Sequence, residues 1–165
     1  NEIRMMADYD VTAVHCPSSN MKLACGGTLS YPPYKDAGVD LRIGTDGAAS
    51  SGNGLNLLHE ARLASLVQRH DHWDSTLLPA KDIFSIATKG SKDWVAWNLD
   101  DIRMRPLGRS NNRHLANLVY NGGDCLDVWV DGQALRLNGE TKTVDEKATI
   151  QELDLAVSKY YDGIE

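Results

Sequence analysis

One aspartate stands where an α/β protein commonly builds a reactive site. Asp46 comes shortly after the apolar segment 39–43 and lies between Gly44 and Gly47. Glycines let the backbone approach closely, and a carboxylate that follows a parallel strand projects from the carboxyl end, where barrels and open sheets bind substrates. Such an aspartate can ligate a metal ion, act as a general base, or do both. The alternative is a loop aspartate that caps the following turn or helix.

A histidine ends an earlier strand-like segment in the same way. His15 closes the β-branched segment 11–14 and is followed by Cys16 and Pro17. Taken alone, a histidine at a strand end is more often a hydrogen-bonded structural residue than a ligand. Two successive strands that each deliver a polar side chain at the carboxyl end favour a common site for His15 and Asp46.

Three further histidines do not form a recognised metal-binding motif. His59 is followed by Glu60, but Leu63 occupies the position that the second histidine of an HExxH motif would take. His70 and His72 lie among acidic residues, and two histidines two positions apart do not fix the geometry of a metal site. The sequence also lacks a nucleophile elbow, a phosphate-binding Walker loop and a dinucleotide-binding fingerprint.

The composition is that of an ordinary globular chain. Its 165 residues are 42% hydrophobic and 24% charged, which is enough for one domain with a buried core. A net charge of −6 argues against a nucleic-acid partner, and no apolar run or leader-like segment indicates a membrane. Three cysteines without CxxC spacing fit a reducing compartment. We therefore expect a cytoplasmic protein.

Strand and helix signals alternate over the first 90 residues. The apolar segments 11–14 and 39–43 predict strands, and 55–69 has the apolar spacing of a helix. Pro79 begins a second helix over 80–88. Alternation of this kind favours parallel βα units. Other expected features of this part are the end of a helix at 2–8, a turn at 18–20, a half-turn at 34–37 and an exposed loop at 70–78.

The second half of the chain changes character. We predict short strands at 94–97, 118–120, 128–130 and 134–137, followed by a closing helix over 146–160. Asp131-Gly132 is a strong hairpin signal between two of these strands. This pattern indicates a small antiparallel layer that follows the βα units.

The order and spacing of several segments match a known family. Residues 15–24 read HCPSSNMKLA, residues 43–50 read IGTDGAAS, and residues 60–64 read EARLA. Together with shorter matches at 87–88, 117–120 and 130–132, they resemble the amidohydrolase superfamily over nearly the whole chain. The most similar branch is the 5-methylthioadenosine/S-adenosylhomocysteine deaminase group, which also includes chlorohydrolase-like enzymes.

This resemblance implies an α/β fold made of the last two βα units of a (β/α)8 TIM-type barrel, strands of a small β-sandwich and a C-terminal helix. Residues 1–92 would be the C-terminal part of a metal-dependent hydrolase barrel, 93–140 the sandwich strands, and 141–165 the C-terminal helical segment. A complete barrel needs about 250 residues, so we expect the chain to be the C-terminal portion of such an enzyme.

The resemblance also implies roles for particular residues. Asp46 would ligate Zn²⁺ or another divalent metal, take a proton from the metal-bound water and help pass it to the departing amine. His15, Asn20 and Ser50 would lie at the substrate pocket, while Ser19 and Asn20 shape its loop. The histidine ligands that the family supplies from earlier barrel strands are absent from this chain, so one carboxylate would need outside partners to hold zinc.

Three functions remain open from the sequence. The first is an aminohydrolase that deaminates a small-molecule substrate, an aminated purine nucleoside or a related heterocycle, by zinc-activated water. The second is chlorohydrolase-type dehalogenation on the same fold, and the third is a catalytically inactive fragment or module without metal. We expect both flanks of the two-stranded sheet to be open edges. The expected macromolecular partner is a second copy or a complementary chain segment, with no nucleic acid and no membrane.

Overall fold

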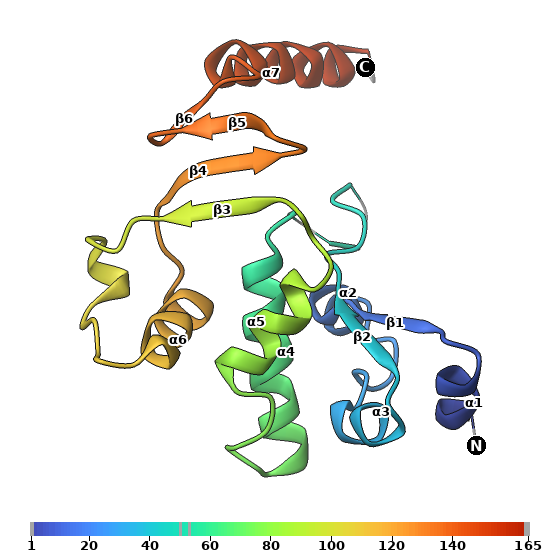
Figure 1. The fold of residues 1–165 in the computed structure, drawn as a ribbon. Coiled ribbons are helices and arrows are strands. Elements are labelled where there is room, and N and C mark those ends of the chain that lie inside the picture. The colour runs from blue at the N-terminus through green and yellow to red at the C-terminus, as the bar shows by residue number, and fades with distance from the viewer. Residues whose placement is uncertain (1, 50, 53, 164–165) are drawn as a thin grey trace. The chain divides into compact units, whose positions relative to one another are not determined.

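The computed structural model describes residues 2–49, 51–52 and 54–163 (Figure 1). The chain forms two compact units. The first consists of Asn1–Gly90 and Leu99–Gly123, and the second of Ser91–Asn98 and Asp124–Glu165. Among the described residues, no helix combines the length and the apolar character that crossing a bilayer requires.

A parallel pair of strands forms the sheet of the first unit. Strand β1 (Thr12–His15) pairs with β2 (Asp40–Ile43), and His15 lies opposite Ile43 at the carboxyl end of both strands. Helix α1 (Glu2–Asp8) precedes β1. Both predicted strands and the helix at 2–8 are confirmed, and the parallel pairing brings the carboxyl ends of the strands to one edge.

Two short helices lie in the crossover between these strands. The turn predicted at 18–20 is wrong, because those residues belong to α2 (Pro17–Lys22), where proline at the first helical position presets the backbone. The half-turn at 34–37 is the second part of α3 (Tyr31–Ala37), which ends at Gly38 in the left-handed conformation.

Three helices build the core of the first unit. Helix α4 (Leu57–His72) begins at Asn56, whose side chain accepts the amides of Leu58 and His59. It packs against α5 (Ala80–Thr88), and both contact α6 (Asn111–Asn121). Each of the helices α3, α4, α5 and α6 contributes at least one residue to the buried apolar cluster. The cluster consists of Tyr31, Ala61, Ala64, Leu78, Ala80, Ile83 and Val119.

One further prediction about this unit is wrong, and a second has the wrong boundary. The segment 118–120 lies in α6 rather than in a strand, since Leu115, Leu118 and Val119 have helical spacing and Ser110 caps the first turn by accepting the Asn112 amide. The loop predicted over 70–78 starts late, because α4 continues to His72 and ends at Trp73 in the left-handed conformation.

The second unit is built on an antiparallel sheet in the order β3-β4-β5-β6. Its strands are β3 (Trp94–Trp97), β4 (Cys125–Val130), β5 (Gln133–Leu137) and β6 (Glu140–Thr141). Asp131 and Gly132 both have positive φ at the β4–β5 turn, which confirms the predicted hairpin. Trp94 stacks on Trp129 across β3 and β4, with ring centroids 5.2 Å apart. Helix α7 (Glu146–Asp162) confirms the predicted closing helix.

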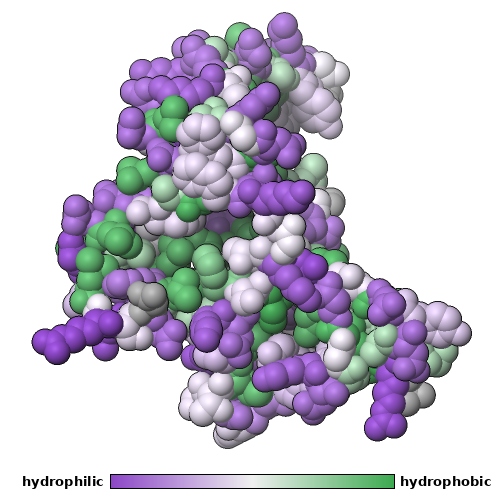
Figure 2. Space-filling model, in the orientation of Figure 1, coloured by the Kyte–Doolittle hydropathy of each residue, from purple (hydrophilic) through white to green (hydrophobic). Residues whose placement is uncertain are grey.

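Apolar side chains are not all confined to the core. Figure 2 shows green apolar groups among purple hydrophilic ones on the face in view. In the first unit, Val14 on β1 is 54% exposed, whereas Ala13 and His15 on the opposite face of the strand are buried. Helices therefore cover one face of the parallel pair.

Candidate functional site at the carboxyl edge of the parallel sheet

The backbone after β2 brings Asp46 close to β1. The Gly44 amide donates to the carbonyl of His15 at 3.0 Å, so the strands remain paired as β2 ends. A Cβ at Gly44 would lie 2.8 Å from Val14 Cγ1 and 3.0 Å from Cys16 Sγ, which explains the glycine. Asp46 itself has φ of 57°, a left-handed conformation that aspartate tolerates better than most residues.

Three donors hold the Asp46 carboxylate. Oδ2 accepts the hydroxyl of Ser19 at 2.6 Å and the hydroxyl of Ser51, and Oδ1 accepts the amide of Gly47 at 2.7 Å. The Ser19 hydrogen bond, followed by those of Ser51 and Gly47, lowers the pKa of Asp46 to about 2. The side chain is therefore an exposed, ionised and oriented carboxylate at neutral pH.

The hydrogen bonds also distinguish the two oxygens of this carboxylate. Each oxygen of an ionised carboxylate offers about two acceptor sites. Within the part of the chain that the structure describes, Oδ2 accepts two hydroxyls and Oδ1 accepts one amide. Oδ1 of Asp46 therefore keeps room for one further donor or for a cation.

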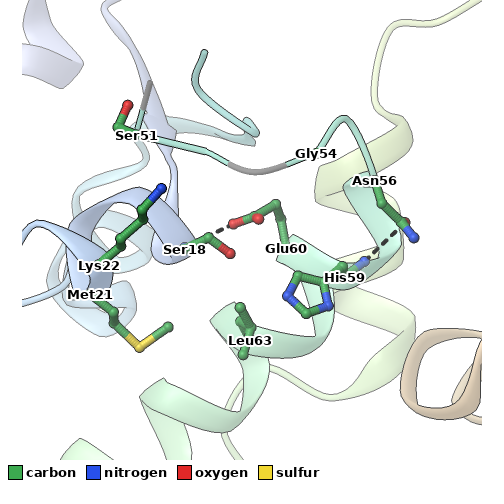
Figure 3. Close-up of a pocket in the computed structure, with 9 residues that line it drawn as sticks. All are labelled: Ser18, Met21, Lys22, Ser51, Gly54, Asn56, His59, Glu60 and Leu63. Atoms are coloured by element: carbon green, nitrogen blue, oxygen red, sulfur yellow. Dashed lines mark hydrogen bonds between the residues drawn. The ribbon is translucent and has the colours of Figure 1, made fainter. Parts of the chain in front are cut away.

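A pocket of about 520 Å³ is lined by Ser51, one of the donors to this carboxylate (Figure 3). Its wall includes Ser51, which donates to Asp46, and Glu60, which accepts the amide of Ser18. The pocket is bounded by α2, by the segment that follows β2, and by the first two turns of α4. Its lining residues are Ser18, Met21, Lys22, Ser51, Gly54, Asn56, His59, Glu60 and Leu63.

The other residues expected at the site lie in different surroundings. His15 is 5% exposed on the buried face of β1, and its Nε2 is buried without a hydrogen-bond partner among the described residues. Burial lowers the pKa of His15, and the charge of Glu60 opposes that shift. Asn20 is half-buried on α2, where its carbonyl accepts the amide of Cys25. Ser50 lies outside the described residues.

Sequence reasoning missed the roles of Ser51 and Glu60. Glu60 is 4% exposed and bonds to a residue 42 positions away. The helical spacing held a usable signal, because Glu60 precedes the buried Ala64 by four positions and so lies on the buried side of α4. A charged residue on such a face is seldom buried without a partner.

Asp46 suits a divalent cation, but the described residues do not make a complete zinc site. An ionised carboxylate is an ordinary zinc ligand, and a catalytic zinc site takes three protein ligands. Across residues 2–49, 51–52 and 54–163, no group of three His, Cys, Asp or Glu side chains is placed to hold a metal ion. Among the described residues Asp46 is therefore a candidate for a single ligand, and any further ligands would lie elsewhere.

Known proteins resemble both the sequence and the structure. A sequence profile described as the Amidohydrolase family matches residues 1–97. A 5-methylthioadenosine/S-adenosylhomocysteine deaminase from Bacillus cytotoxicus is 34% identical over 168 residues, which cover 92% of this chain and 38% of that protein.

Two solved structures have the same fold over nearly all of the chain. An adenosine deaminase from Xanthomonas campestris with bound zinc has a TM-score of 0.84 and 29% identity, covering 96% of this chain and 39% of its own. Atrazine chlorohydrolase from Arthrobacter aurescens, complexed with zinc, has a TM-score of 0.76 and 25% identity. The match covers 92% of this chain and 37% of the chlorohydrolase chain. The chain thus spans about two fifths of the length of the proteins that it matches.

Proposed function

The chain belongs to the amidohydrolase family, and from this membership we propose that it is the C-terminal part of a metal-dependent aminohydrolase. The proposed substrate is an aminated purine nucleoside, such as 5-methylthioadenosine, S-adenosylhomocysteine or adenosine, or a related heterocycle. Support comes from the deaminase that is 34% identical and from the zinc-containing adenosine deaminase of the same fold.

In this proposal, β1 and β2 are the last two strands of a (β/α)8 barrel. Parallel sheets are normally covered on both faces, yet Val14 is exposed on one face of β1 while Ala13 is buried on the other. Further barrel strands beside β1 and β2 would close the ring and cover the exposed face. Strands β3 to β6 would then belong to a small β-sandwich, with α7 as a C-terminal helical segment.

The proposed role of Asp46 is to bind and move a proton. Zinc supplies an acidified water in sites of this type, because a bound divalent ion lowers the pKa of water from 15.7 to about 7. Asp46 would provide one ligand, with the remaining ligands outside the described residues. The single acceptor site left on its Oδ1, beside the Gly47 amide, would bind the metal ion before the reaction and would take the proton of the attacking water during it. The proton would then pass to the departing amine, so that the aromatic C–N bond breaks and ammonia leaves.

The observation that carries the proposal is the oriented, ionised carboxylate at the carboxyl edge of the parallel strands. The test compares wild-type protein with Asp46→Asn, both purified at their native length and supplied with zinc. Ammonia release from the three purine nucleosides is measured together with conversion of the adenine ring to hypoxanthine. We expect wild-type activity and a loss of about 10²–10⁴-fold in Asp46→Asn, the usual contribution of a positioned general base.

Dehalogenation is the second candidate, favoured by the structural match to atrazine chlorohydrolase. The two reactions share the attack of water and differ in the leaving group. Chloride release from a chlorinated triazine, without ammonia release from nucleosides, would identify this function. A protein that releases neither product and binds no zinc would be the inactive module.

A further inference from the structure

Glu60 is a buried acidic residue at the start of α4. It is 4% exposed, and a buried carboxyl group is costly unless it is hydrogen-bonded. Its Oε2 accepts the amide of Ser18 at 2.9 Å, as Figure 3 shows. Ser18 lies in the first turn of α2, where backbone amides have no partner inside the helix. Glu60 therefore fixes the start of α2 against α4.

The next residue of α2 contacts the candidate catalytic group. Ser19 is 5% exposed, and its hydroxyl donates to Asp46 Oδ2 at 2.6 Å. Helix α2 has six residues, too few to be stable without tertiary contacts. The direction of the Ser19 hydroxyl therefore depends on what holds α2, and the Ser18–Glu60 hydrogen bond is one such contact.

We propose that Glu60 is a positioning residue for Asp46 and acts through the Ser18 amide and the Ser19 hydroxyl. With α2 fixed by Glu60, Ser19 shares Oδ2 with Ser51, and one acceptor site stays open on Oδ1 of the same carboxylate. The catalytic part of this inference rests on the proposed function. The structural part, a connection from Glu60 to the orientation of Asp46, does not depend on it.

The same helix offers a matched control for Glu60. Gln68 is 1% exposed on α4, accepts the Tyr31 amide at 2.7 Å and donates to the Leu29 carbonyl at 2.6 Å. Glu60→Ala and Gln68→Ala both leave buried or half-buried backbone groups without their side-chain partner, so both should lower the melting temperature. Glu60 alone of the two is bonded to α2.

The first measurement is amide hydrogen exchange in the metal-free protein, normalised to the core amide of Ile83. Glu60→Ala should speed exchange of the Ser18 amide, which loses its acceptor. It should also speed exchange of the Gly47 amide, which donates to Asp46, by about tenfold or more. Gln68→Ala should leave Gly47 unchanged. The inference is overturned if Glu60→Ala speeds exchange at Ser18 while Gly47 keeps its wild-type protection.

The second measurement is the kinetics of deamination at saturating zinc. Residues that orient a metal ligand typically contribute 10- to 100-fold, so kcat should fall by that factor in Glu60→Ala with little change in KM. Ser19→Ala should lower kcat by a similar factor. In the double variant, Glu60→Ala with Ser19→Ala, kcat should fall by no more than the larger of the two single losses. Glu60→Gln should recover most of the activity, because an amide oxygen can also accept the Ser18 amide.

Each possible result has a distinct meaning. Multiplied losses in the double variant, or a kcat for Glu60→Ala equal to that of Gln68→Ala, would overturn the positioning role. If Glu60→Ala does not fold, Glu60→Asp, which shortens the side chain by one methylene, replaces it in both measurements. A wild-type protein without deaminase activity would refute the proposed function, and the exchange at Gly47 would still decide whether Glu60 orients Asp46.

Discussion

Replacing Gly44 by alanine should destabilise the chain, because the added methyl group would press against two neighbouring side chains. The new Cβ would lie 2.8 Å from Val14 Cγ1 and 3.0 Å from Cys16 Sγ, where ordinary contacts are 3.4–4 Å. Val14 is β-branched and has little freedom about χ1, and the hydrogen bond from Gly44 to the His15 carbonyl holds the backbones together. Overpacking of this kind costs about 1–3 kcal/mol.

For a chain of this length, each kcal/mol lowers the melting temperature by about 2–4 °C, so Gly44→Ala should melt about 2–12 °C below wild type. Gly27→Ala is the matched control, since a Cβ there meets nothing within 4 Å and the backbone is not in the left-handed region. It should melt at or slightly above the wild-type temperature. Circular dichroism on the three proteins decides the matter, and equal melting temperatures for Gly44→Ala and Gly27→Ala would refute the steric reasoning.

Three further predictions concern hydrogen-bonded side chains. Ser19→Ala removes the largest of the three contributions to the low pKa of Asp46, so the pKa should rise from about 2 toward 3.8 in a ¹³C NMR titration of metal-free protein; an unchanged value would contradict the assignment. The pKa of Asp40 in the folded protein is lowered chiefly by its hydrogen bond from Lys89. This contact therefore stabilises the fold at pH values above the ordinary pKa of 3.8. The stabilisation is lost as the pH falls through the lowered pKa of the folded state. The stability difference between wild type and Lys89→Ala should therefore be present at neutral pH and shrink below about pH 4 in denaturant titrations. Ser65→Ala should lower the free energy of unfolding by about 1–3 kcal/mol in the same assay, because the buried hydroxyl donates to the buried carbonyl of Leu78. A change near zero would contradict a stabilising role for this hydrogen bond.

The regular elements follow from local patterns in the sequence. The strands at 12–15, 40–43 and 94–97 and the helix at 80–88 have the apolar periodicity and proline positions that mark such elements. The segment 118–120 predicts a strand, although it lies in α6, because three consecutive apolar residues have no period of their own. Its helical nature appears only when Leu115 and the Ser110 cap are included.

The candidate site was predictable only in part. Asp46 is identified by its place after a strand and between glycines, which is local information. The acceptor of the Ser18 amide is Glu60, 42 positions away, and such a tertiary pairing leaves no spacing signal in a single sequence. The side of β1 on which His15 lies depends on which face the helices cover, and the strand alone does not specify this.

The measurement that tests the central claim most directly is ammonia release from an aminated purine nucleoside by zinc-loaded wild-type protein and by Asp46→Asn. The account predicts steady deamination by the wild type and a loss of about 10²–10⁴-fold in the variant. It also predicts that Asp46→Asn folds, because asparagine tolerates the left-handed conformation at position 46 and its oxygen can still accept the serine hydroxyls, although the hydrogen bond from the Gly47 amide is lost. A folded Asp46→Asn variant that releases ammonia at the wild-type rate would contradict it.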